Sequence, residues 1–229
     1  MENTGKAILA EFIGTFALIF FGAGSVILAL NGQLDLVGVA LAHGLVIAIM
    51  VTQMGHLSGG VFNPAIQVAL WVTGKMSGAR SAVYVAAQLA GAVIAAFLLR
   101  YLEPHQAFQA AGGGTPALGP GIAVGKGILM EAVGTFFLVW AVFATVIDDR
   151  GPFDKTAGFT IGLTITFGIL ALGPYTGGAF NPARWFGPAL AAGQWANWYV
   201  WIVGPIAGGV LAGVLYWSVF LRDREPATP

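Results

Sequence analysis

Two copies of the tripeptide Asn-Pro-Ala carry the most informative polar side chains of an almost entirely apolar chain, at Asn63-Pro64-Ala65 and Asn181-Pro182-Ala183. Asparagine offers side-chain N–H donors to a polar solute, and Arg184, which follows the second copy, offers a cationic donor. The sequence shows no nucleophile–base pair and no metal-ligand cluster, and it contains no cysteine. We therefore expect neither an enzyme nor a metal or cofactor site.

The surroundings of the tripeptide also occur twice. Residues 58–62 (SGGVF) precede the first copy and residues 176–180 (TGGAF) precede the second, 118 positions later. Residues 10–16 (AEFIGTF), which include Glu11, are echoed 120 positions later by residues 130–136 (MEAVGTF), which include Glu131. Nested matches at nearly one offset indicate an internal duplication. We assign one domain, 1–229, made of repeats 6–103 and 124–221 and an outer loop at 104–123.

The composition is that of a membrane protein. Hydrophobic residues form 57% of the chain and charged residues 9%, whereas a soluble domain carries roughly a quarter charged residues. Several apolar runs are long enough to cross about 30 Å of hydrocarbon. We predict an all-α membrane protein with spans at about 8–30, 37–55, 80–101, 126–147, 156–173 and 197–221.

The distribution of Lys and Arg predicts the orientation. With both termini on one side, that side receives seven basic residues against two, Arg100 and Lys126, on the other; the seven are Lys6, Lys75, Arg80, Arg150, Lys155, Arg222 and Arg224. We therefore expect cytoplasmic termini, and we expect the plasma membrane rather than an organelle membrane. Zero net charge and the lack of a basic patch argue against a nucleic-acid partner.

Each repeat contains an odd number of spans, so the two repeats must cross the membrane in opposite directions. The segments after the tripeptides, about 64–72 and 182–191, are too short to span. Asn followed by Pro favours the start of a helix, so we predict two re-entrant half-helices. The alternative is a pair of ordinary surface loops with capped helices, which the symmetric duplication disfavours.

Together, the paired tripeptides, one Glu near the start of each repeat and the Arg after the second tripeptide resemble the aquaporin (major intrinsic protein) family over about residues 6–221. The resemblance implies an inverted repeat with six tilted helices and two half-helices in a right-handed bundle. It also implies a homotetramer in the lipid bilayer, with one pore per subunit for water and small neutral solutes.

In that fold the half-helices meet at the midplane by their N-termini, so their positive dipole ends would repel cations. Asn63 and Asn181 would donate hydrogen bonds to a passing water and so interrupt proton transfer along the chain of waters. Arg184, because an intramembrane charge is costly, should face the lumen. We expect Glu11 and Glu131 to accept hydrogen bonds from the re-entrant loops rather than to relay protons.

The resemblance places His43, Ile169, Gly178 and Arg184 at the narrow outer constriction. This set is similar to that of tonoplast intrinsic proteins associated with water and ammonia, whereas Trp185 stands where glycerol channels have Asp. The loop carbonyls expected to line the pore are those of Gly59, Gly60, Val61, Gly177, Gly178 and Ala179.

The leading hypothesis is a passive channel for water that also conducts ammonia or other very small neutral solutes. A broader facilitator for glycerol or urea is the alternative within the family. A structural membrane protein with a vestigial pore is the alternative from another class, and the intact Asn63, Asn181 and Arg184 disfavour it.

Overall fold

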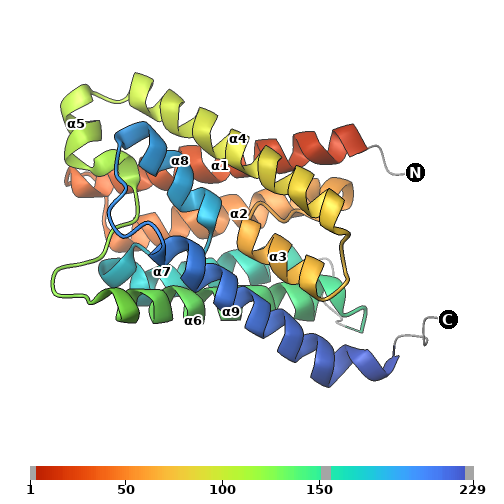
Figure 1. The fold of residues 1–229 in the computed structure, drawn as a ribbon. Helices are drawn as coiled ribbons and strands as arrows, with labels where there is room; N and C mark the ends of the chain where they lie inside the picture. The colour runs from red at the N-terminus through yellow and green to blue at the C-terminus, as the bar shows by residue number, and fades with distance from the viewer. Residues whose placement is uncertain (1–3, 151–155, 225–229) are drawn as a thin grey trace.

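The computed structural model of the chain describes residues 4–150 and 156–224, so Lys155, which entered the charge count, lies outside the described residues. The described residues form helices and no strand, which confirms the all-α prediction. Both described ends of the chain lie at the same end of the bundle (Figure 1), as an even number of crossings requires.

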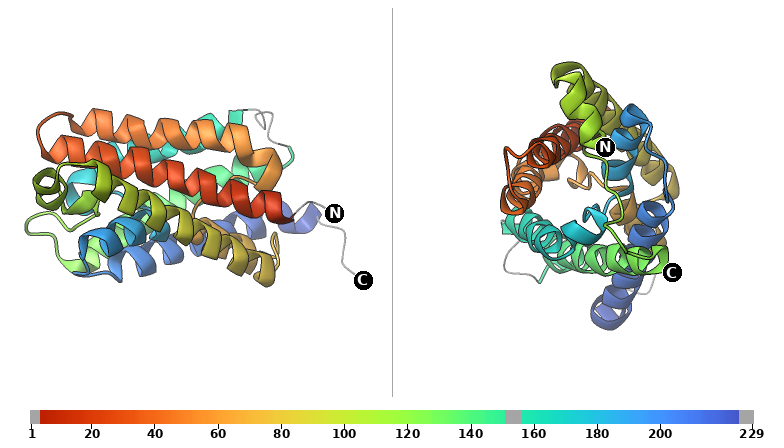
Figure 2. Two further views of the ribbon diagram at one scale, coloured as in Figure 1. Left: turned by 90° about the horizontal axis from the view of Figure 1, so that it is seen from above. Right: turned by 90° about the vertical axis from the view of Figure 1, so that its left-hand side faces the viewer.

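Six helices are long and apolar enough to cross a membrane. Seen end-on, the two shorter helices that follow the Asn-Pro-Ala tripeptides lie on one side of the bundle, between two of these six (Figure 2). The six are α1 (Thr4–Leu30), α2 (Leu36–Ser58), α4 (Gly78–Leu102), α6 (Val124–Val142, continued by the π-helical turn η2, Phe143–Ile147), α7 (Ala157–Thr176) and α9 (Val200–Tyr216, continued by η4, Trp217–Leu221, and η5, Arg222–Arg224). Each lies within a few residues of its predicted segment.

The two short helices, α3 (Pro64–Val72) and α8 (Pro182–Ala192), begin at the prolines of the repeated tripeptide. The preceding asparagine is the N-cap in both cases, with extended backbone and a side chain that accepts a hydrogen bond from the first turn. Proline fits the first helical position because no N–H is needed there. The two helices begin close together in the middle of the bundle and run towards opposite ends of it (Figure 1).

The connection between the repeats is partly helical. It contains α5 (His105–Ala110) and a short 3₁₀ turn, η1 (Gly112–Gly114), whose glycines have positive φ angles. Asn31, after α1, donates a side-chain hydrogen bond to the carbonyl of Ala107 at 3.1 Å. This part of the connection is therefore held against the end of the bundle.

The phenylalanine before each tripeptide adopts a backbone conformation that is rare outside glycine. Phe62 and Phe180 have φ angles of 48° and 49°, and both rings are buried. A Cβ atom at Gly14 would come within 2.1 Å of the Phe62 ring, and one at Gly134 within 2.0 Å of the Phe180 ring. The absence of a side chain at these glycines therefore creates the space in which each phenylalanine packs.

Gly134→Ala is expected to destabilise the protein by about 1–3 kcal/mol, because the new methyl group forces the Phe180 ring to move within a packed core. Gly125→Ala is the matched control on the same helix, since no atom lies within 4 Å of a Cβ there. Thermal unfolding of both variants in detergent measures the difference. Equal unfolding temperatures would contradict this packing role.

A charged cluster ties the loop after α6 to the end of α9. Asp148 accepts hydrogen bonds from Arg150 Nε at 2.7 Å and from the Tyr216 hydroxyl at 3.0 Å, and its second oxygen also pairs with Arg150 Nη2. Arg150 Nη2 further donates to the Phe220 carbonyl at 3.1 Å. Hydrogen bonds from the Arg150 guanidinium lower the pKa of Asp148 to about 2.

Because the folded-state pKa of Asp148 lies below its ordinary value, its stabilising contribution is complete above pH ~4 and declines as the pH falls towards 2. Asp148→Asn should therefore lower the unfolding temperature at pH 7, and the gap to the wild type should narrow as the pH falls below 4. Asp149→Asn removes the same charge at the exposed neighbouring position and serves as control. A gap that stays constant down to pH 3 would contradict this assignment.

Candidate functional site

The backbone of the two loops that precede the half-helices follows the same path in both repeats. Gly59 and Gly177 cap α2 and α7 with φ angles of 96° and 80°, and Gly60 and Gly178 follow at 63° and 57°. These left-handed conformations favour glycine. They turn the chain back into the bundle, where the N–H groups that follow Gly60 and Gly178 bond to other parts of the chain rather than to the preceding helices.

Glu11 on α1 accepts hydrogen bonds from the first loop. One carboxylate oxygen accepts from the Ser58 hydroxyl at 2.6 Å and from Val61 N–H at 3.0 Å. The other accepts from Phe62 N–H at 2.8 Å and from the Gln88 side chain of α4 at 2.7 Å. A fully buried carboxylate thus satisfies the N–H groups of the non-helical backbone and links three elements.

Glu131 on α6 occupies the corresponding position in the second repeat. It accepts from the Thr176 hydroxyl at 2.6 Å, from Ala179 N–H at 3.1 Å and from Phe180 N–H at 2.7 Å. Position 208, 120 residues after Gln88, is a glycine, so the second carboxylate has no counterpart of the glutamine. The loop-bracing contacts expected of both glutamates are present.

The two asparagines are held from both ends of their amide groups. Asn63 Oδ1 accepts from Ala65 N–H at 2.8 Å, and Asn181 Oδ1 accepts from Ala183 N–H at 2.9 Å. Asn63 Nδ2 donates to the Phe180 carbonyl at 2.8 Å, and Asn181 Nδ2 donates to the Phe62 carbonyl at 2.9 Å. Each amide nitrogen carries two hydrogens, so one hydrogen of each asparagine is left to donate elsewhere.

Arg184, in the first turn of α8, is 2% exposed. Its Nε donates to His43 Nε2 at 2.9 Å, and its Nη1 donates to the carbonyl of Gly114 at 3.0 Å. His43 Nδ1 lies 2.8 Å from the Val39 carbonyl. Because Nε2 accepts, the proton of His43 is on Nδ1 and the ring is neutral. His43 is therefore a fixed acceptor for Arg184, and this geometry disfavours the charge-switching role that a histidine at a constriction could otherwise have.

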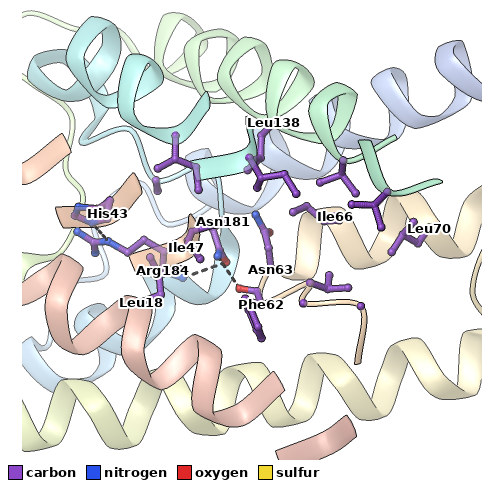
Figure 3. A pocket seen from close by; sticks show the side chains of 18 of the residues that line it. Leu18, His43, Ile47, Phe62, Asn63, Ile66, Leu70, Leu138, Asn181 and Arg184 are labelled. Carbon is purple, nitrogen blue, oxygen red and sulfur yellow. Dashed lines mark hydrogen bonds between the residues drawn. The ribbon is translucent and has the colours of Figure 1, made fainter. Parts of the chain in front are cut away.

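A cavity runs along these residues. Figure 3 shows Asn63 and Asn181 next to each other, with Arg184 and His43 on one side of them and Ile66 and Leu70 on the other. The lining of the cavity includes the carbonyl-bearing loop residues Gly59, Gly60, Val61, Gly178 and Ala179. It also includes many aliphatic side chains, among them Leu18, Ile47, Leu138, Val142, Ile161 and Ile165.

The electrostatics of this cavity favour neutral solutes. Both half-helices present their N-termini to it, and each N-terminus carries about half a positive charge. Among the described residues that line it, the charged side chains are Arg184 and Lys75, with no Asp or Glu. The polar side chains Asn63, Asn181 and Arg184 therefore offer hydrogen-bond donors within a largely apolar wall, which suits a small neutral molecule and, with the helix N-termini, opposes a cation.

Six of the residues expected at the pore do not line this cavity: Gly177, Ile169, and the Pro and Ala of both tripeptides. Gly177 caps α7 and turns towards the outer connection, where a Cβ would meet Pro116 at 2.8 Å. Ile169 is 2% exposed and packs behind Gly178, where a Cβ would lie 3.2 Å from its Cγ1 atom. Pro64, Ala65, Pro182 and Ala183 are buried in the first turns of α3 and α8 and act through helix geometry.

The structure adds a residue that the sequence did not reveal. Gly114, in the outer connection, supplies the carbonyl that holds Arg184. Its φ is 71°, and a Cβ atom there would lie 2.5 Å from the Ala23 carbonyl, so that only glycine fits. The run of three glycines at 112–114 was the available signal, since such a run marks a close backbone approach.

Comparison with known proteins agrees with this geometry. The family model described as "Major intrinsic protein" matches residues 2–216. Aquaporin TIP4-4 of Zea mays is 46% identical over 232 residues, which cover 96% of this chain and 90% of that protein. Aquaporin TIP2-3 of Zea mays is 42% identical over 230 residues, with the same two coverages.

A more distant relative and a solved structure show the same likeness. Aquaporin-4 of Mus musculus is 40% identical over 224 residues, which cover 96% of this chain and 69% of that protein. The X-ray structure of the aquaglyceroporin from Plasmodium falciparum matches with a TM-score of 0.84 and 26% identity, covering 96% of this chain and 98% of that chain. The chain belongs to the major intrinsic protein family, the aquaporins, and is similar to the TIP aquaporins within it.

Proposed function

We propose that this aquaporin is a passive channel for water that also admits ammonia or other very small neutral solutes and excludes protons and ions. The observation that carries the proposal is the pair of fixed asparagine amides at the cavity, between two half-helix N-termini. A water that accepts from both amides turns its hydrogens away from the midplane, which interrupts proton transfer along the water chain.

The groups around Arg184 support the ammonia part of the proposal. His43 uses its accepting nitrogen on Arg184 and its other nitrogen on α2, so it leaves little hydrogen-bonding capacity for a solute. Gly178 has no side chain, and the apolar Ile169 stands behind it. Such a wall leaves the constriction wide and offers few hydrogen-bonding groups to a solute, which favours the passage of ammonia as well as water.

Membership of the aquaporin family also helps to decide between a narrow channel, a wider facilitator and an enzyme. Aquaporins are channels for small solutes, which fits a channel and not an enzyme. The aquaglyceroporin likeness is compatible with a wider facilitator for glycerol or urea. Trp185 stands next to Arg184, at the position where glycerol channels have Asp, and this difference supports the narrower channel.

We also propose that the channel is one domain of two inverted repeats, 6–103 and 124–221, and that it forms a homotetramer with cytoplasmic termini. Apolar side chains exposed on the outer faces of α2 and α7 support burial against lipid or another subunit; they are Leu41, Leu45, Ile49, Phe159, Leu163 and Phe167. The TIP names of the relatives favour the tonoplast over the plasma membrane that the sequence led us to expect. Native mass spectrometry tests the stoichiometry.

The substrate proposal predicts fast water flux and ammonia entry in the same vesicles. Proteoliposomes with an internal pH dye should alkalinise on ammonia addition clearly faster than empty liposomes, and they should also shrink faster in hyperosmotic buffer. Stopped-flow recordings of both signals, with glycerol and urea as further solutes, measure the range. Fast shrinkage without added ammonia entry would reduce the proposal to a strict water channel, and glycerol flux comparable with water flux would favour the wider facilitator.

The filter assignment predicts an unequal effect of a double variant. The double variant His43→Phe with Ile169→His should narrow the constriction and add a hydrogen-bond donor. We expect ammonia flux to fall by about tenfold and water flux by a few-fold, because one or two hydrogen bonds worth roughly 1 kcal/mol each change. Ile169→Val, which keeps the apolar wall, is the control. Equal loss of both fluxes would show that these positions do not form the filter.

A further inference from the structure

The solute cavity is bordered at one end by a turn that departs from the α-helical pattern. α6 ends at Val142 and continues as the π-helical turn η2, and Val146 and Ile147 of this turn line the cavity. Lys75 and Met76, in the connection between α3 and α4, also line it. Since α6 ends and α4 begins on the side of the bundle where both described chain ends lie (Figure 1), these four residues form the mouth of the cavity on that side.

Val146 stands between the solute cavity and a neighbouring pocket. It lines the cavity together with Gly59, and the same two residues border a pocket that contains Thr52 and His56. The two spaces therefore meet at Val146 and Gly59. The position of Val146 decides how widely they are connected.

The π turn keeps the side chains of this helix directed at the cavity. Leu138, Val142 and Val146 all line it and are four residues apart. In an α-helix four residues turn by about 400°, so each such step rotates the side chain by roughly 40° away from the previous one. The wider π turn has more residues per turn and reduces this rotation at Val146, and π turns within helices are frequent at functional sites.

Asp148 closes the π turn and ties it to α9. Its backbone N–H donates to the Phe143 carbonyl, five residues back, at 2.8 Å. Its carboxylate accepts from the Tyr216 hydroxyl of α9 at 3.0 Å and from Arg150 Nε at 2.7 Å. Arg150 in turn donates to the Phe220 carbonyl at 3.1 Å. The side chain of Asp148 therefore joins the end of η2 to the end of α9.

Tyr216 makes two separable contacts with this part of the bundle. Its ring packs against Trp140 and Phe143, with ring centroids 5.0 and 6.0 Å away, and its hydroxyl reaches Asp148. Phenylalanine at this position keeps the ring contacts and removes the hydrogen bond. The role of the hydrogen bond can therefore be tested while the packing of α6 against α9 is preserved.

We propose that Asp148 and Tyr216 are positioning residues for permeation: their hydrogen bond holds η2 where Val146 and Ile147 leave the mouth open. Neither Asp148 nor Tyr216 lines the cavity, so both act through η2. When the hydrogen bond is lost, η2 moves and the mouth narrows. This inference rests on the channel function proposed above, and it concerns the rate of permeation rather than the choice of solute.

Water flux through Tyr216→Phe tests the proposal. Permeability per channel should fall by about two-fold or more, because the loss of one hydrogen bond shifts η2 towards positions that narrow the mouth. Stopped-flow shrinkage of proteoliposomes with a known number of channels measures it. Tyr84→Phe is the matched control: that hydroxyl accepts from Arg80 Nη2 on its own helix at 2.8 Å, and Tyr84 does not line the cavity. Unchanged permeability in Tyr216→Phe, or an equal fall in Tyr84→Phe, would overturn the proposal.

The accessibility of position 146 separates a change at the mouth from a loss of stability. The chain contains no cysteine, so Val146→Cys introduces a single thiol. A charged methanethiosulfonate reagent should reduce water flux through this variant, whereas its reaction with Ala79→Cys, at an exposed position outside the cavity, should leave the flux unchanged. Adding Tyr216→Phe should slow the reaction at position 146 by about two-fold or more and leave the rate at position 79 unchanged, because the mouth alone moves.

Two results of the thiol experiment would overturn the proposal. Reaction at position 146 without loss of flux would show that Val146 is not at the mouth. Equal reaction rates with and without Tyr216→Phe would show that the hydroxyl does not position η2. Wild-type vesicles without water flux would instead refute the channel function, and the reaction rates at positions 146 and 79 would still report whether Tyr216 positions η2.

Discussion

The structure depends on how non-helical backbone is satisfied inside an apolar bundle. Each unpaired N–H or C=O group in such surroundings costs several kcal/mol, so irregular loops occur at this depth only where other groups pair them. Glu11 and Glu131 supply that pairing, since each carboxylate accepts two loop N–H groups and one hydroxyl. Without these acceptors the loop N–H groups would be buried without hydrogen-bond partners, and the loops would not be stable inside the bundle.

The positions of the two asparagines and of the half-helix N-termini depend on these braced loops. Once the loops are fixed, α3 and α8 must begin at the centre of the bundle, and their N-cap asparagines come close enough for each to donate to the opposite loop. These crossed hydrogen bonds orient both amides, and the positive N-terminal ends of the two opposed half-helix dipoles add a positive potential at the same place. The proposed selectivity for neutral solutes is therefore a consequence of the same contacts that hold the fold together.

Local signals were sufficient to predict the half-helices. Asn-Pro specifies the cap and the first turn through its own backbone chemistry, and the predicted segment 64–72 coincides with α3. The glutamate contacts could be expected as well, because one acid per repeat in an apolar chain must find donors. Contacts between distant segments could not be predicted in the same way. One partner of Arg184 is the backbone carbonyl of Gly114, and a carbonyl in a Gly- and Pro-rich connection leaves no side-chain signature. For Ile169, counting along the chain gave a position, but whether the side chain faces the cavity or packs behind Gly178 depends on the rotation of α7.

The most direct test of proton exclusion compares water and proton permeability in one preparation of proteoliposomes. Osmotic shrinkage reports water, and an internal pH dye under an imposed pH gradient, with valinomycin and potassium to prevent a counter-potential, reports protons. We expect water permeability well above that of empty liposomes and proton permeability equal to theirs. Proton permeability that rises together with water permeability would contradict the central claim that the crossed asparagines and helix N-termini interrupt proton transfer.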